Sequence, residues 1–118
     1  MMGRMTELWQ LGALDLAARI KRGDVSSRAV VEAHLARVDA VNPHLNAIVR
    51  RLDDEALAAA DAADRAVADG HALGAFHGVP ITVKENIDVA GAPTTQGLAV
   101  LADAIAAVDA PSVERMRA

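Results

Sequence analysis

The sequence predicts an α/β fold, and two observations lead to this prediction. Most of the first 70 residues show apolar side chains at helical spacing, bounded by residues that cap helices. Two short apolar runs, at residues 45–49 and 81–83, read instead as strands. The order is therefore helices, strand, helix, strand and helix, as in α/β proteins, where the loops beyond the strand ends carry function.

The first two predicted helices lie before residue 43. Residues 13–22 form the first, and Gly23 suits the left-handed position that follows a last helical turn. One of the serines at residues 26–27 caps a second helix, which extends to about Val41. Pro43 is expected to stop this helix, because proline cannot continue the helical hydrogen-bond ladder.

The next two elements are a short strand and an alanine-rich helix. Residues 45–49 (LNAIV) form the predicted strand. Asp53 or Asp54 then opens a helix that runs to about Asp69 and is closed by Gly70. Alanine favours helix but buries little area, so this helix offers a narrow, small-residue face for packing.

The last third of the chain changes character. Residues 78–80 (Gly-Val-Pro) are a turn signal before the predicted strand at residues 81–83, which ends at Lys84. A polar, turn-rich segment follows. Asp109 is predicted to cap a last helix that starts near residue 110, with a proline in its first turn.

Composition narrows the function classes. The net charge of −4 argues against direct nucleic-acid binding, which needs clustered basic residues. The absence of cysteine excludes disulfides, thiolate metal sites and a cysteine nucleophile within these 118 residues. No signal peptide or membrane span is evident, which favours a cytoplasmic protein without membrane contact. The thin alanine core leads us to expect one piece of a larger domain.

Lys84 is the candidate catalytic residue of the sequence. The chain holds only two lysines, Lys21 and Lys84, against ten arginines. Lysine becomes a neutral base when its surroundings disfavour the charged form, whereas arginine stays protonated. From the residues alone, an ordinary solvated lysine remains the alternative. The four histidines do not show metal-motif spacing, so no metal is predicted.

The segment around Lys84 resembles a known motif. Residues 78–95 (GVPITVKENIDVAGAPTT) are similar to the lysine-bearing motif of the amidase-signature family, and residues 23–27, 41–49 and 109–118 match further family blocks in order. The resemblance implies the N-terminal part of an α/β/α layered fold with a mixed central sheet. In a single amidase domain, residues 1–42 would be outer helices and residues 43–118 the start of the α/β core.

The resemblance also implies an activity. Such enzymes hydrolyse a carboxamide to a carboxylic acid and ammonia with a Ser–cis-Ser–Lys triad and no cofactor, and Lys84 matches the lysine that acts as the base. The three serines, Ser26, Ser27 and Ser112, do not lie in the Gly-Ser-Ser-Gly setting of the family's serines. This chain alone is therefore expected to be inactive. Helix capping is the simpler interpretation of Ser26 and Ser27.

Substrate and partners follow from the same resemblance. The expected partner is a small-molecule amide substrate. A homodimer of the full-length enzyme is a further possibility that the resemblance leaves open. Thr94 and Thr95 are candidates for substrate binding, although hydrogen bonding within a turn explains them as well. Two other functions stay open: the A-type subunit of a tRNA-dependent amidotransferase, and a non-catalytic remnant or binding module.

Overall fold

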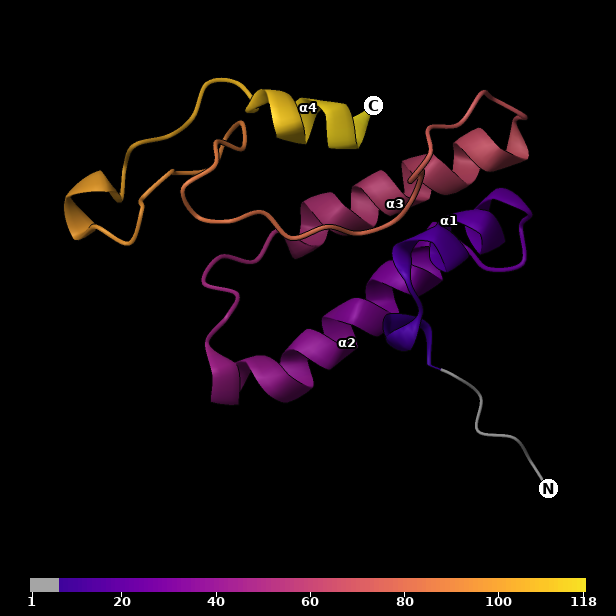
Figure 1. Cartoon of the computed structure of the whole chain (residues 1–118), viewed down its shortest axis with the longest axis horizontal. Coiled ribbons are helices and arrows are strands. Elements are labelled where there is room, and N and C mark those ends of the chain that lie inside the picture. Colours follow the sequence, from indigo (N-terminus) through magenta and orange to yellow (C-terminus); the bar gives the residue numbers. More distant parts are fainter. Residues whose placement is uncertain (1–6) are drawn as a thin grey trace. The chain divides into compact units, whose positions relative to one another are not determined.

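The computed structural model describes residues 7–118, and the regular structure of this part is helical (Figure 1). The elements in chain order are η1 (Leu8–Gln10), α1 (Ala13–Lys21), α2 (Ser27–Leu45), α3 (Asp53–Ala68), η2 (Ala99–Leu101) and α4 (Pro111–Arg117). The chain divides into two units, one ending at Pro80 and the other running from Ile81 to Ala118. None of the helices in the described part combines the length and apolarity needed to cross a bilayer.

The first unit contains η1 and the first three α-helices. Helix α1 begins after Gly12, and the chain leaves it through Gly23 at φ +74°, as the sequence predicts. Leu16 and Ile20 of α1 pack on Val30 of α2, and all three are at most 2% exposed. Partly buried side chains complete this core: Leu8, Leu11, Val25, Val67 and Val79. The core is small, as the alanine-rich composition suggests.

The beginning of α2 is fixed by two different side chains. The Ser26 hydroxyl accepts a hydrogen bond from the Ala29 amide at 3.0 Å, which confirms the predicted serine cap. Asp64 of α3 adds a second cap that the local sequence does not reveal. Its carboxylate accepts the backbone N–H groups of Ser27 at 2.6 Å and Arg28 at 3.1 Å. A negative charge at a helix N-terminus is favourable, so this contact joins α3 to α2.

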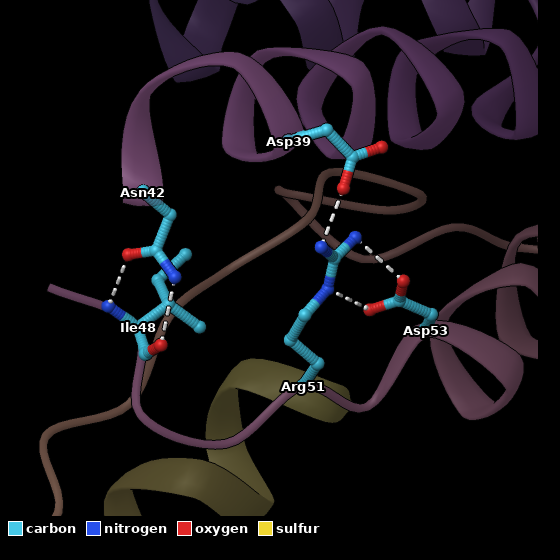
Figure 2. Close-up of polar contacts among 5 residues, drawn as sticks. All are labelled: Asp39, Asn42, Ile48, Arg51 and Asp53. Atoms are coloured by element: carbon cyan, nitrogen blue, oxygen red, sulfur yellow. Dashed lines mark hydrogen bonds and ion pairs between the residues drawn. The ribbon is translucent and has the colours of Figure 1, made fainter. Parts of the chain in front are cut away.

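The predicted end of α2 and the following strand are wrong. Helix α2 continues through Pro43 to Leu45 and ends at Asn46, whose φ of 49° is left-handed. Residues 46–50 form no strand. The Asn42 side chain instead takes both backbone groups of Ile48, accepting from N–H and donating to C=O at 2.9 Å each (Figure 2). The Asn42 side chain therefore satisfies the backbone N–H and C=O of Ile48, for which the predicted strand would have required a neighbouring strand.

The connection to α3 is held by Arg51. Its guanidinium lies between Asp39 of α2 and Asp53, the first residue of α3 (Figure 2). The hydrogen bonds that the guanidinium donates to Asp53 and then to Asp39 raise the pKa of Arg51 above its usual value. Helix α3 spans almost the predicted range, and the chain turns after it through Gly70 at φ +69°.

The second unit has little regular structure before α4. The strand predicted at residues 81–83 does not form, and in residues 7–118 the sole β-bridge joins Pro93 to Ile105. The Thr94 amide donates to Ala104 O at 3.0 Å, the Gly91 amide donates to Ala106 O at 2.9 Å, and the Ala106 amide donates to Ala92 O at 3.0 Å. A strand needs a neighbouring strand for its backbone groups. The part of the chain that is described gives residues 81–83 no such neighbour, and the mixed sheet is not formed there.

Helix α4 forms where the sequence predicts a last helix, but its N-cap residue differs from the predicted one. Pro111 occupies the first turn as expected, but Ala110 is the N-cap and makes no side-chain cap bond. Asp109 does not cap the helix. Its carboxylate accepts the Ala90 amide at 2.8 Å and pairs with Arg117 at 3.0 Å. These contacts join the residue before the N-cap of α4 to the last residue of the helix and to the loop at residue 90.

Candidate functional site

Lys84 begins a tight turn in the second unit. The Ile87 amide donates to Lys84 O at 2.9 Å, which closes the turn directly after the extended segment at residues 81–83. The Lys84 side chain is exposed. The structure therefore places the predicted lysine at the start of an irregular loop, where a side chain can reach a ligand.

Lys84 lines an open groove of about 360 Å³. The apolar lining comes from the extended segment and from α4: Ile81, Val83, Ile87, Val113 and Met116. The polar residues that line it are Thr82, Lys84 and Ser112. The lining of this open groove is therefore mostly apolar.

The Lys84 ammonium makes no ion pair within the described residues. No carboxylate of residues 7–118 lies within 4.0 Å of it, although Glu85 is its neighbour in sequence. Glu85 does not line the groove. Its carboxylate instead accepts a hydrogen bond from the Thr95 hydroxyl at 2.6 Å, and this contact is partly buried.

The two predicted substrate threonines both donate to acids of their own loop. Thr94 donates to Asp88 at 2.6 Å and Thr95 donates to Glu85. The Thr95 oxygen also accepts the Gly97 amide at 3.2 Å. Neither threonine lines the groove beside Lys84. Substrate contact by Thr94 and Thr95 stays a prediction, while the turn hydrogen bonding given as its alternative is observed.

The three serines have separate surroundings. Ser26 caps α2, and Ser27 is 1% exposed and donates from its hydroxyl to Gly78 O at 2.6 Å. Both are engaged in structure. Ser112 is exposed on the first turn of α4, at the groove that Lys84 lines.

The histidine near the motif has a structural partner. His77 lies before the Gly78 turn, and its Nε2 is 2.9 Å from Ala63 O in α3. His34 is half-buried, with its Nδ1 at 2.7 Å from Val30 O one turn earlier in α2.

Sequence reasoning missed two contact-forming acids, Glu85 and Asp64. The paired threonines about ten positions after Glu85 were a sequence signal for a hydrogen-bond partner of this carboxylate. Thr95 is that partner, at 2.6 Å. No local pattern indicates Asp64, because the amides that it accepts lie 36 and 37 positions earlier in the chain.

The chain belongs to the amidase family. The family model described as Amidase matches residues 29–118, which include Lys84, its loop and α4. The match therefore covers most of the chain.

The curated relatives act on amides or form amidotransferases. The chain is 51% identical over 110 residues to the indoleacetamide hydrolase of Bradyrhizobium diazoefficiens, covering 93% of this chain and 21% of that protein. It is 41% identical to an acylamidase of Rhodococcus erythropolis, covering 96% of this chain and 24% of the relative. It is 40% identical to the A-type subunit of the glutamyl-tRNA(Gln) amidotransferase of Salinispora arenicola, covering 97% and 23%. The chain thus spans about a fifth to a quarter of the length of these relatives.

A solved structure has the same arrangement. It comes from work on a vestigial protein complex and the evolutionary origins of an s-triazine catabolic enzyme. The TM-score is 0.86 at 31% identity, over 91% of this chain and 24% of that one.

Proposed function

We propose that this chain is the N-terminal part of an enzyme that hydrolyses a carboxamide to a carboxylic acid and ammonia. The observation that carries the proposal is the position of Lys84. The residue that matches the family's catalytic lysine lines a mostly apolar groove and forms no ion pair within the described residues. A base must be free to accept a proton, so an unpaired lysine suits this role.

In the proposed mechanism, Lys84 is the base of the Ser–cis-Ser–Lys triad. A nucleophilic serine attacks the amide carbonyl, and the middle serine passes its proton to the lysine. Lys84 then returns the proton to the leaving nitrogen, which departs as ammonia, and water releases the acid from the acyl-enzyme. The two serines and the mixed sheet of the layered fold are expected from outside residues 1–118.

We further propose a carboxamide with an apolar, aryl-bearing acid part as the substrate. Two findings support this choice. The identity to an indoleacetamide hydrolase is 51%, against 40–41% for the acylamidase and the amidotransferase protein given above. The groove wall beside Lys84 is aliphatic, from residues such as Ile81, Val83 and Met116. An aliphatic wall favours an apolar substrate body.

A second candidate is the A-type subunit of a tRNA-dependent amidotransferase. The 40% identity to such a protein over 97% of the chain favours it. This function would bring partner subunits and an aminoacyl-tRNA substrate. The two candidates differ in what accompanies the protein and in which amide it consumes.

The test uses the product expressed from the native gene, with its reading frame followed past Ala118. Purified protein is incubated with indoleacetamide, with simple aliphatic amides and with glutamine, and released ammonia is measured. Release from indoleacetamide without other subunits, lost in Lys84→Met, supports the proposed amidase. Co-purifying subunits and glutamine-dependent release would favour the amidotransferase. No release from any amide by pure protein would overturn the hydrolase proposal.

A further inference from the structure

Glu85 stands directly after Lys84, and this adjacency is a chemical problem for the proposed base. A carboxylate within about 4–6 Å of an ammonium favours the charged form of the amine. A lysine that is to accept a proton has to be neutral. A flexible glutamate next in sequence is well placed to form such a pair.

The structure keeps this glutamate occupied elsewhere. Its carboxylate accepts the Thr95 hydroxyl at 2.6 Å, ten residues along the chain, in a partly buried contact. The Thr95 oxygen accepts the Gly97 amide at 3.2 Å, so the hydroxyl proton is directed to Glu85. Gln96 and Gly97 both have positive φ, 51° and 76°, which turns the chain tightly at this point.

The other charged groups near Lys84 are also engaged or lie outside the groove. The Asp88 carboxylate accepts the Thr94 hydroxyl, and Asp109 is paired with Arg117. The α4 residues that line the groove are Ser112, Val113 and Met116, and none is charged. The remaining charged residues of α4, Glu114 and Arg115, do not line it.

We propose that Glu85 and Thr95 are a positioning pair, in which the Thr95 hydroxyl holds the Glu85 carboxylate away from the neighbouring Lys84 ammonium. The pair does not touch substrate in this proposal. It acts through Lys84, and the inference rests on the proposed role of that lysine as a base. Loss of the hydroxyl frees the carboxylate to pair with Lys84 and lowers the fraction of neutral amine.

The test compares Lys84 with Lys21, the other lysine of residues 1–118. The native gene product is treated with a limiting amount of acetic anhydride near neutral pH, and peptide mass spectrometry gives the ratio of acetylation at Lys84 to that at Lys21. Acetic anhydride reacts with the neutral amine, and Lys21 at the end of α1 is the internal reference. Circular dichroism checks that every variant is folded.

Thr95→Val is expected to lower the Lys84 to Lys21 ratio roughly two- to fivefold, the effect of gaining one exposed ion pair. Thr95→Ser keeps the hydroxyl and should match wild type. The double variant Thr95→Val with Glu85→Gln should restore the wild-type ratio, because the freed side chain then carries no charge. An unchanged ratio in Thr95→Val would overturn the inference, and so would a double variant as low as the single one.

A second measurement keeps the proposal open to refutation if Thr95→Val does not fold. Glu85→Gln alone is expected to change the ratio by less than about twofold, because the wild-type carboxylate is bonded to Thr95 and forms no ion pair with Lys84. A larger rise in the ratio would mean that Glu85 pairs with Lys84 in the wild type and would overturn the proposal.

The activity readout separates this inference from the proposed function. If amide hydrolysis is found, Thr95→Val should move the acidic limb of kcat/KM to higher pH, and the double variant should move it back. A wild type that hydrolyses no amide counts against the proposed function alone. In that case the ratio of acetylation at Lys84 to that at Lys21 still tests the positioning role of Glu85 and Thr95.

Discussion

Asp64→Ala tests how the helices of the first unit are joined. The Asp64 carboxylate accepts the backbone N–H groups of Ser27 and Arg28 at the start of α2. Ser27 is 1% exposed, so its amide has little access to water once the carboxylate is removed. An unsatisfied buried donor costs about 1–3 kcal/mol. The lost charge at the helix N-terminus adds about 0.3–1 kcal/mol.

These two effects together predict a loss of about 1–4 kcal/mol in the free energy of unfolding. Asp64→Asn keeps one oxygen for the Ser27 amide and loses the charge, so about 1 kcal/mol is expected. Asp69→Ala is the control, because this exposed carboxylate at the C-cap of α3 accepts no hydrogen bond within the described residues.

Urea unfolding followed by circular dichroism at 222 nm measures all three variants. The expected order of destabilisation is Asp64→Ala, then Asp64→Asn, then Asp69→Ala with almost no effect. An Asp64→Ala midpoint equal to that of Asp69→Ala would refute the reasoning, because it would mean that water replaces the carboxylate at α2 without cost.

Asn42→Ala should cost about 1–3 kcal/mol in the free energy of unfolding, because Ile48 loses the partner of both its backbone groups. The Ile48 backbone amide should also exchange its hydrogen faster in this variant. An unchanged exchange rate would contradict the prediction. Gly78→Ala is expected to destabilise more than Gly70→Ala, although both glycines have positive φ and share a cost of about 1–2 kcal/mol. An added Cβ at Gly78 would lie 3.0 Å from the Ser27 side chain, whereas Gly70 has open space, so equal thermal shifts would show that the close approach does not matter.

The helices were predictable where local chemistry determines them. Ser26 and Gly23 sit at boundaries that the sequence marks with cap and left-handed signals, and the structure confirms them. Pro43 misled the prediction because one missing donor in a last turn is tolerated when the helix ends two residues later. The strands failed for a different reason. Strands need distant partners, and local composition at residues 45–49 and 81–83 contains no information about them.

Of the candidate site, the sequence indicates Lys84 but not the contacts around it. Lys84 is found from a motif that is contiguous in sequence. The contact between Thr95 and Glu85 depends on the turn at Gln96 and Gly97, which brings residues ten positions apart together. The Asp64 cap spans 37 positions and depends on the packing of α3 against α2.

The most direct test of the central claim compares the two lysines of this chain. Ammonia release from indoleacetamide is measured for the native gene product, for Lys84→Ala and for Lys21→Ala, with circular dichroism spectra of all three. The proposed role as a general base predicts that Lys84→Ala loses at least about 100-fold in kcat. Lys21→Ala, on the exposed last turn of α1, should keep wild-type activity. Equal activity in the two variants would contradict the assignment of Lys84 as the base.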